Sequence, residues 1–455
     1  EPDNSRQEYT LAHVPWSRSK FRNYRLKVFT ICHIGCEIPR ISRLTFFIPI
    51  FQAMKYDIAI IGGGIVGLAS AWKILERQPG LKLVIVEKES KVATHQTDRN
   101  SGVIHSGIYY KPGSAKAVNC VKGAAMLKDF CREQNIPFEL CGKVIVANLE
   151  HELPVLEGIY QRGLLNGLSD LKVIDAKETK ELEPHCAAIR SIWVPQAGII
   201  DYRVVAERLA QLIILHGGSV LTGFKVEKIT EQSDGITILS DHDEIKSGMV
   251  IGCAGLYADH LVKMAGLEPP HQIVPFRGEF YSLTRGAEKL VHGLIYPVPD
   301  INFPFLGVHL TKRIMGGVEA GPNAVLAFRR EGYRHMDIHG GELLEALRYK
   351  GFQRLAIRHW RKGMDEMARS FSARAFVKSL QKLVPELRLQ DIKRSRTGVR
   401  AQALDHNGNM IDDYVVLQQE RMIHICNAPS PAATSCLSIG EFISELALQK
   451  IKSLS

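Results

Sequence analysis

The sequence predicts an α/β fold that combines a nucleotide-binding layer with a second, sheet-rich part, and three observations lead to this prediction. An apolar, β-branched segment at 56–61 is followed at once by the glycine-rich sequence 62–67 and by residues 68–77, which have helical composition. The next apolar segment, 82–87, ends in an acidic residue. The apolar segment 248–255 again ends in small residues and glycine. This order is typical of a Rossmann-type domain.

The glycine-rich sequence has the spacing of a dinucleotide-binding turn. Gly62, Gly64 and Gly67 form the pattern GxGxxG, and Glu87 ends the second predicted strand twenty residues beyond Gly67. Glycines at these positions permit a tight turn and let a pyrophosphate approach the backbone, where the helix N-terminus attracts it. Glu87 would accept hydrogen bonds from the adenosine ribose hydroxyls. The motif therefore predicts a bound dinucleotide.

Two further segments favour FAD over NAD. Residues 97–107 are rich in small and hydroxyl side chains, which suit a loop beneath the ribityl and pyrophosphate groups of a flavin. Residues 248–255 are similar to the second dinucleotide-contacting turn of a glutathione-reductase-like FAD-binding domain. No Cys or His is placed to attach the flavin, so we predict non-covalent FAD. Further expected contacts are Lys88, Thr97, Asn100, Ser101, Gly102, Val226, Ala254 and Gly255.

The composition is that of an ordinary globular protein. Of 455 residues, 45% are hydrophobic and 23% are charged, which excludes a disordered or collagen-like chain. No apolar run approaches the ~20 residues that cross a bilayer. The formal net charge of +10 is concentrated in residues 1–53 and 348–400, the latter with fifteen Lys or Arg and four Asp or Glu. Because the basic residues are local and carry no recognition motif, we expect no nucleic-acid partner.

The nine cysteines contain no CxxC pair, so their spacing fits neither a disulfide framework nor a structural zinc site. We therefore expect no metal. Reduced thiols indicate a reducing compartment, and we predict a cytoplasmic protein. Peripheral contact with the inner membrane, or a mitochondrial location in a eukaryote, stays open.

Residues 1–53 form a leader outside the predicted fold. They lack the apolar core and cleavage site of a secretory signal. Three interpretations stay open: translated upstream sequence ahead of a start at Met54, a mitochondrial presequence, or a genuine extension.

Residues 55–450 contain a series of different short motifs. Together, and in this order, they are specific for one protein family. They are NSGVIHSGIYYKP at 100–112, CGK at 141–143, VPFRG at 274–278, YPVP at 296–299, GPNAVLAF at 321–328, GVRAQ at 398–402 and NAPSPAATS at 427–435. These motifs resemble the L-2-hydroxyglutarate dehydrogenase/oxidase family of the D-amino-acid-oxidase-like FAD superfamily. The resemblance implies oxidation of L-2-hydroxyglutarate to 2-oxoglutarate by hydride transfer from C2 of the substrate to N5 of the flavin.

The implied reaction needs a base for the C2 hydroxyl proton and cations for two carboxylates. His105 is the first candidate for the base, because it lies on the loop that should pass the flavin and can titrate near neutral pH. His309 is the second candidate. For the carboxylates, Arg277 and Arg400 lie in glycine-flanked segments, and a planar guanidinium suits two-point binding.

The C-terminal segment resembles the superfamily's flavin-contacting helix start. Residues 427–438 are rich in Pro, Ala, Ser and Thr, and residues 439–450 have helical composition. The N-terminal end of such a helix would stabilise negative charge on the reduced flavin. The expected backbone contacts are Ala432, Ala433, Thr434 and Ser435.

One motif departs from the family pattern. Where the family usually has Gly-His before Asn-Ser-Gly, this chain has Asp98 and Arg99. The change removes a glycine's conformational freedom and replaces a titratable group with a permanent cation, which could pair with a phosphate. This departure keeps a non-catalytic FAD-binding protein open as an alternative. An amine or amino-acid oxidase of the same fold, acting on glycine, sarcosine or a D-amino acid, is a separate alternative, and two well-placed arginines for a diacid would argue against it.

The chain is expected to divide into two parts, each assembled from separated segments. The FAD-binding part comprises 54–140, 200–270 and 390–455, and the substrate part comprises 141–199 and 271–389. Within the latter, 342–389 is basic and helical, and forms either a solvated face or a surface that docks on anionic membrane lipid. Docking would suit a membrane quinone as the electron acceptor, with oxygen as the alternative.

Overall fold

The structure, a computed structural model, describes residues 55–299 and 307–454. These residues fall within one compact unit, Ala53–Ser455. The three interpretations of the leader concern residues outside the described part of the chain. Within that part, no helix combines the length and the apolar character needed to span a bilayer.

An eight-stranded sheet forms the predicted nucleotide-binding layer. Its centre is parallel: β1 lies between β2 and β12, while β9 pairs with β2 and β20 with β12. Two antiparallel strands, β10 and β11, extend one edge. The strands are β1 (Lys55–Ile61), β2 (Leu83–Glu87), β9 (Ser219–Thr222), β10 (Lys228–Gln232), β11 (Gly235–Leu239), β12 (Glu244–Gly252), β19 (Val415–Gln418) and β20 (Met422–Asn427).

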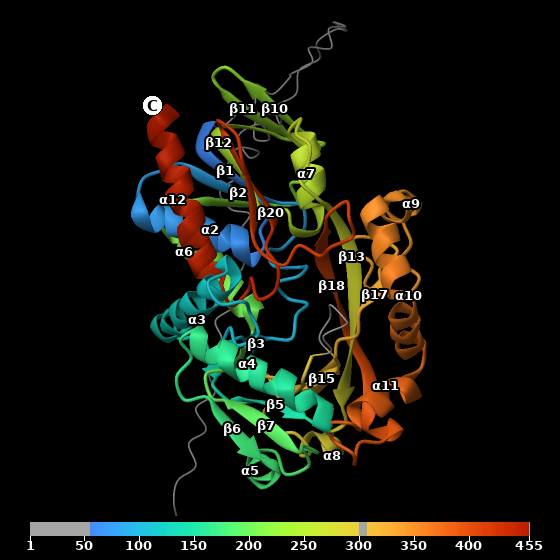
Figure 1. Cartoon of the computed structure of the whole chain (residues 1–455). Coiled ribbons are helices and arrows are strands. Elements are labelled where there is room, and N and C mark those ends of the chain that lie inside the picture. The colour runs from blue at the N-terminus through green and yellow to red at the C-terminus, as the bar shows by residue number, and fades with distance from the viewer. Residues whose placement is uncertain (1–54, 300–306, 455) are drawn as a thin grey trace, which may run out of the picture. The chain divides into compact units, whose positions relative to one another are not determined.

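The central strands end in runs of buried apolar residues because both faces of this sheet are covered there. Ile58 and Ile60 of β1 belong to one core, whereas Ala59 and Ile61 belong to another. The first core is shared with four helices that lie together at the left of Figure 1. The helices of this layer are α2 (Ile65–Arg77), α3 (Ala115–Glu133), α6 (Tyr202–Leu215) and α12 (Cys436–Leu454) on the first core, and α7 (Ala258–Met264) on the second.

A nine-stranded sheet forms the second part, and its longest pair is β13 with β18, which run antiparallel. Its strands are β5 (Lys143–Ala147), β6 (Lys172–Asp175), β7 (Arg190–Val194), β13 (Gln272–Leu283), β14 (Leu294–Pro297), β15 (His309–Lys312), β16 (Val318–Gly321), β17 (Val325–Leu326) and β18 (Ile392–Leu404). A small third sheet consists of β3 (Val103–Ile104), β4 (Phe138–Glu139) and β8 (Gly198–Ile200). The predicted α/β fold with a second, sheet-rich part is therefore confirmed.

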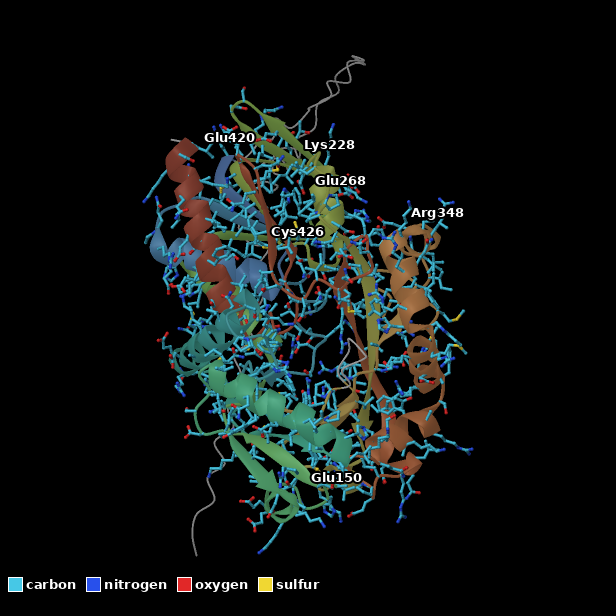
Figure 2. The ribbon with its side chains drawn as sticks, viewed as in Figure 1. Glu150, Lys228, Glu268, Arg348, Glu420 and Cys426 are labelled. Carbon is cyan, nitrogen blue, oxygen red and sulfur yellow. The ribbon has the colours of Figure 1, made fainter. Side chains whose placement is uncertain are left out.

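The basic stretch 342–389 is largely helical, as predicted, and lies beside the β13–β18 pair (Figure 1). Arg348, at the C-terminal end of the first of these helices, points outward in Figure 2. Around the second sheet the helices and single turns are α4 (Leu153–Leu165), α5 (Ala176–Leu182), α8 (Arg285–Glu288), α9 (Gly340–Arg348), α10 (Lys350–Phe371), α11 (Ala373–Leu380), η1 (Glu150–Glu152), η2 (Gly255–Tyr257) and η3 (Leu389–Asp391).

The sheets place one segment differently from the expected division. Residues 390–404 were assigned to the FAD-binding part, but β18 pairs with β13 over almost its whole length. The strand therefore belongs to the second sheet. The reason is that sheet membership depends on hydrogen bonds to distant segments, which the sequence of a strand does not display.

Candidate active site

A cavity of about 1660 Å³ lies where the carboxyl ends of β1, β2 and β12 face the second sheet. Its lining includes Gly62, Glu87 and Cys253 from the first sheet, and Phe280 and Arg400 from the second. The carboxyl ends of parallel strands are where ligands bind in open α/β sheets. The volume exceeds the ~300–1,000 Å³ of ordinary small-molecule sites, so the cavity has room for a dinucleotide and a small substrate.

Two of the three glycines of the motif, Gly62 and Gly67, lie where no side chain fits. A Cβ on Gly62, whose φ is +116°, would lie 2.3 Å from the carbonyl oxygen of Cys253. A Cβ on Gly67 would lie 2.2 Å from the carbonyl oxygen of Gly62. Gly62 and Gly64 line the cavity, whereas Gly67 is buried inside α2 and does not. Gly67 therefore permits the tight packing of the turn, and the other two leave open backbone for a ligand.

The start of α2 is open toward the cavity. Its N-cap, Gly64, supplies no capping side chain, and the N–H of Ile65 donates to Oγ1 of Thr97 at 3.0 Å. The carboxylate of Glu87 accepts the N–H of Gly63 at 2.7 Å. Because Gly64 itself supplies no cap, this helix start is suited to an anion such as pyrophosphate.

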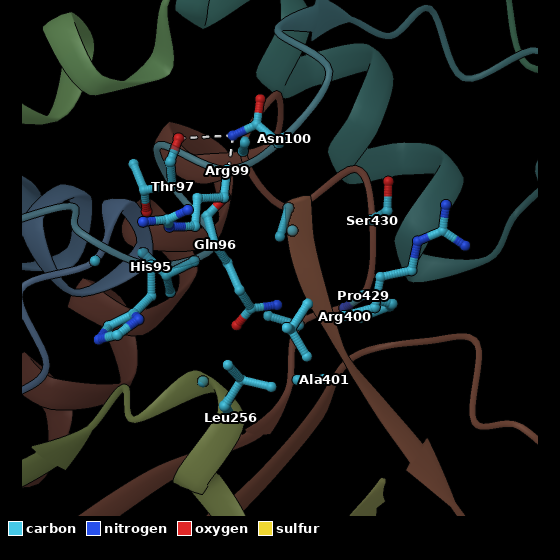
Figure 3. Close-up of a pocket in the computed structure, with 18 of the residues that line it drawn as sticks. His95, Gln96, Thr97, Arg99, Asn100, Leu256, Arg400, Ala401, Pro429 and Ser430 are labelled. Atoms are coloured by element: carbon cyan, nitrogen blue, oxygen red, sulfur yellow. Dashed lines mark hydrogen bonds between the residues drawn. The ribbon is translucent and has the colours of Figure 1, made fainter. Parts of the chain in front are cut away.

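Asn100 organises the loop that follows. Its Oδ1 accepts the N–H of Gly102 at 2.8 Å, and its Nδ2 donates to the carbonyl of Thr97 at 2.6 Å (Figure 3). Asn100 and Ser101 line the cavity. Gly102 does not line the cavity. Its φ is +68°, and its backbone lies close to the carbonyl oxygen of Ile200.

The remaining expected cofactor contacts from the first layer also line the cavity: Lys88, Val226, Ala254 and Gly255. The ammonium of Lys88 pairs with Glu331 and lies 4.7 Å from the ring centroid of Tyr257.

Asp98 and Arg99 point to different places. Arg99 lines the cavity, and its guanidinium lies 4.0 Å from the ring centroid of Tyr333. Asp98 is about half exposed, and its carboxylate lies 3.7 Å from Nε of Arg203. The departure from the family motif thus puts a stacked cation in the cavity wall and an acid outside it.

Both candidate bases and one candidate arginine meet at the substrate end of the cavity. His105, His309 and Arg400 line it, together with Tyr109 and Tyr296. Figure 3 shows Arg400 among the lining side chains. The ring of His309 stacks on that of Tyr296 with centroids 3.9 Å apart, and its Nδ1 lies 2.9 Å from the carbonyl oxygen of Gly307.

Burial and nearby cations keep these histidines neutral. Burial, then the charges of Lys143, His309 and Lys116, lower the pKa of His105 to about 3. Burial lowers the pKa of His309 to about 3, with Arg400 and Lys143 adding to the effect and the bond to Gly307 opposing it. Burial also lowers the pKa of Arg400, yet a guanidinium remains protonated in proteins.

The structure does not bring Arg277 into the cavity, contrary to the expectation. Its guanidinium forms a buried ion pair with Glu279, Nη2 to Oε1, at 2.9 Å. The side chains of β13 alternate between the two faces of the sheet, so Gly278 and Phe280 line the cavity while Arg277 and Glu279 lie on the other face. A glycine-flanked arginine gave no signal of which face it would take.

The C-terminal segment reaches the cavity through three of its four expected residues. Ala432, Ala433 and Thr434 line the cavity, and α12 begins two residues later. Oγ1 of Thr434 accepts the N–H of His105 at 3.2 Å, which ties this segment to the substrate end. Ser435 is fully buried and does not line the cavity.

Two lysines near the substrate end were not among the predicted site residues. Lys116 lines the cavity, and its Nζ pairs with Asp412 at 2.5 Å. Lys143 is completely buried beside Tyr109 and Tyr296. The available signal for Lys143 was a single charge at the head of the apolar segment 143–147, which is unusual for a strand buried on both faces.

Comparisons with known proteins agree with this geometry. Residues 57–446 match the family described as FAD dependent oxidoreductase, abbreviated DAO. The L-2-hydroxyglutarate dehydrogenase of Indibacter alkaliphilus is 49% identical over 398 residues, covering 87% of this chain and 100% of that protein. The mitochondrial L-2-hydroxyglutarate dehydrogenase of Homo sapiens is 45% identical, covering 88% of this chain and 90% of that protein.

Solved structures share the fold. FAD-bound L-α-glycerophosphate oxidase from Mycoplasma pneumoniae superposes with a TM-score of 0.70 at 22% identity, covering 88% of this chain and 95% of that one. Glycine oxidase from Geobacillus kaustophilus superposes with a TM-score of 0.67 at 16% identity, covering 87% of this chain and 95% of that one. The resemblance seen in the sequence is thereby confirmed: the chain belongs to the DAO family of FAD-dependent oxidoreductases, and within it to the L-2-hydroxyglutarate dehydrogenase family.

Proposed function

We propose that this protein oxidises L-2-hydroxyglutarate to 2-oxoglutarate. The observation that carries the proposal is the meeting of two neutral histidines and Arg400 at one end of a cavity whose other end has the dinucleotide motif. The name of relatives at 45–49% identity supports the choice of substrate.

The residues present fit FAD at the nucleotide end. A side chain at Gly62 would collide with the backbone, and the N-cap of α2, Gly64, has no capping side chain. Glu87 lies beside Gly63, where it would hold the ribose, and Arg99 lies in the wall as a positive charge for a phosphate. Bound FAD supplies the acceptor for the hydride that leaves C2 of the substrate.

His309 is the better placed of the two candidate bases. The carbonyl of Gly307 can only accept a hydrogen bond, so Nδ1 of His309 carries the proton and Nε2 is left as an acceptor. The stacking on Tyr296 fixes the orientation of the ring. We propose that Nε2 of His309 takes the hydroxyl proton of the substrate, and that His105 contacts the same hydroxyl from the loop after β3. This reverses the order expected from sequence alone.

Arg400 is proposed to bind the carboxylate next to the reacting carbon. It lines the cavity, and its charge is close enough to His309 to lower that group's pKa. A bidentate pair would hold the substrate with its hydroxyl toward the histidines. The enclosed setting strengthens this attraction relative to water.

The alternative substrate class is a monocarboxylate amine or amino acid. Glycine oxidase shares the fold, and one arginine suffices for one carboxylate. Steady-state turnover with an artificial dye as acceptor separates the two. We expect turnover with L-2-hydroxyglutarate and not with glycine, sarcosine or D-alanine. The reverse result would favour an amine oxidase, and no turnover with any of them would favour a non-catalytic FAD protein.

We also propose that α10 docks on an anionic membrane surface. Trp360, Met364 and Phe371 are exposed and share one face of α10 beyond a kink at His359. Ahead of the kink, Ile357 is exposed and Leu355 is buried. Arg354, Arg358 and Arg361 accompany that apolar face and are also exposed. Exposed apolar residues among cations are typical of helices that lie in a membrane interface. Docking there would place a membrane quinone within reach as the electron acceptor, with oxygen as the alternative.

A further inference from the structure

Lys143 is a buried cation directly behind the wall of the substrate end. Its side chain is completely buried, and its Nζ has no hydrogen-bond partner within residues 55–299 and 307–454. The ammonium lies 4.7 Å from the ring centroid of Tyr109 and 5.0 Å from that of Tyr296. Both tyrosines line the cavity, and the hydroxyl of Tyr109 is buried with no hydrogen-bond partner among the described residues. One aromatic ring therefore separates Lys143 from the cavity.

Among the described residues, the groups that face Lys143 carry no compensating negative charge. Burial raises the pKa of the Cys120 thiol, on α3, to about 12, and raises the pKa of Tyr109 and of Tyr296 above the ordinary value, so all three are neutral. His105 and His309 are neutral as well. No carboxylate in the described part of the chain forms an ion pair with Lys143.

A buried charge without a counter-ion is costly, and proteins normally pair such a group. The cost at Lys143 would be relieved by an anion in the adjacent cavity. The substrate of the proposed reaction carries two carboxylates, and of the two arginines expected to bind them Arg400 lines the cavity while Arg277 is held on the other face of β13. Among the other cations of the lining, Arg99 is stacked on Tyr333 and Lys116 is paired with Asp412. A second carboxylate would therefore gain most from a cation that has no counter-ion.

We propose that Lys143 is a specificity-determining residue, whose charge selects a dicarboxylate over a monocarboxylate substrate while Arg400 binds the carboxylate next to the reacting carbon. This inference rests on the proposed function. The ammonium attracts the distal carboxylate across low-dielectric protein, where the interaction is stronger than in water. The hydroxyl of Tyr109, at the cavity wall, is available to donate to the same carboxylate.

The pH dependence of selectivity follows from the state of the lysine. Burial lowers the pKa of Lys143 to about 8. The ammonium is thus charged at pH 7 and loses its charge as the pH rises above 8, so the preference for the dicarboxylate should decline over that range. Arginine remains charged there, so a Lys143→Arg variant should keep its preference at high pH.

The test compares kcat/KM for L-2-hydroxyglutarate and for L-2-hydroxybutyrate, which lacks the distal carboxylate. In FAD-loaded Lys143→Met, kcat/KM for the dicarboxylate should fall by roughly tenfold or more, as expected when one partner of a desolvated charge pair is removed. The value for the monocarboxylate should be nearly unchanged. The Ki of glutarate, which has both carboxylates but no hydroxyl to oxidise, should rise by a similar factor.

Lys312→Met is the matched control, since Lys312 lies in the same sheet, pairs with Glu139 at 2.7 Å and does not line the cavity. It should leave the selectivity ratio unchanged. An equal loss for both substrates in Lys143→Met, or an unchanged ratio, would overturn the inference while leaving the proposed function intact. Wild-type protein that does not oxidise L-2-hydroxyglutarate would instead overturn both.

Discussion

Nδ1 of His309 lies 2.9 Å from the carbonyl oxygen of Gly307, two residues earlier in the chain. The bond fixes the proton on Nδ1 and leaves Nε2 as an acceptor before any substrate arrives. Because burial also keeps the ring neutral, with its pKa lowered to about 3, no proton needs to leave His309 before the reaction. The local chain thus leaves one histidine of the cavity neutral, with an oriented Nε2 that can accept a hydrogen bond.

Replacing His309 by Gln should remove the proposed base. We expect kcat to fall about 10²- to 10⁴-fold, the usual contribution of general base catalysis. His105→Gln should cost less, because its ring has no comparable orienting bond among the described residues. Rapid-reaction kinetics of flavin reduction measure both variants, with FAD content as the control for folding. A larger loss in His105→Gln would assign the base to His105 instead.

The buried histidines should make the fold sensitive to acid. Their pKa values are lowered to about 3 in the folded protein, against 6.5 for an ordinary histidine. Between these values the unfolded chain binds protons that the folded chain does not. Stability is therefore fully present above about pH 6.5 and falls below it, by roughly 1 kcal/mol per pH unit for each histidine.

Denaturant unfolding of the holoenzyme at pH 7.5 and pH 5 measures this effect. His309→Gln should show a smaller loss of stability between the two pH values than the wild type. Equal losses would mean that His309 titrates normally in the folded protein.

Replacing two glycines that lie in helices should distinguish the effect of tight packing from the effect of helix propensity. Gly67→Ala in α2 should abolish FAD retention, because its Cβ would lie 2.2 Å from a backbone oxygen. Gly158→Ala in α4 meets nothing within 4 Å and should stabilise the helix by up to about 1 kcal/mol. Flavin absorbance after gel filtration, with thermal unfolding, checks both. Full FAD retention in Gly67→Ala would contradict the tight-turn geometry.

Replacing Arg400 and replacing Arg277 should have different effects on the protein. Arg400→Met should lower kcat/KM strongly while the folded protein keeps FAD. Arg277→Met should remove the guanidinium from the buried carboxylate of Glu279, which would keep only the contacts of Asn323, Ser370 and His335, and should destabilise the fold by roughly 3 kcal/mol. Any Arg277→Met protein that folds should keep its KM. A raised KM with normal stability would place Arg277 at the substrate after all.

Membrane docking depends on the exposed face of α10. Replacing Ile357 and Met364 by Ser and Arg361 by Glu should abolish sedimentation with vesicles that contain anionic lipid, and should leave dye-coupled turnover unchanged. Neutral vesicles and raised salt should weaken binding of the wild type, since each basic residue near the surface contributes ~1 kcal/mol. Retained sedimentation of the variant would exclude this face as the docking surface.

The dinucleotide-binding motif could be predicted from the sequence because its geometry depends on residues that are neighbours in the chain. The turn at Gly62 and the strand ending in Glu87 depend on residues near them in the chain, and both lie at the cavity as expected. The faces of β13 and the sheet to which β18 belongs depend on distant hydrogen bonds, so Arg277 and residues 390–404 were misplaced. Lys143 was missed because its importance arises from the absence of a partner, which a sequence does not display.

The most direct test of the account is anaerobic titration of the FAD-loaded protein with each enantiomer of 2-hydroxyglutarate. L-2-Hydroxyglutarate should bleach the flavin absorbance band completely, with one equivalent of 2-oxoglutarate formed per flavin. The D-enantiomer should leave the band unchanged, because the same two carboxylate contacts would turn its C2–H away from the flavin. Absence of bleaching by the L-enantiomer, or equal bleaching by both, would contradict the account.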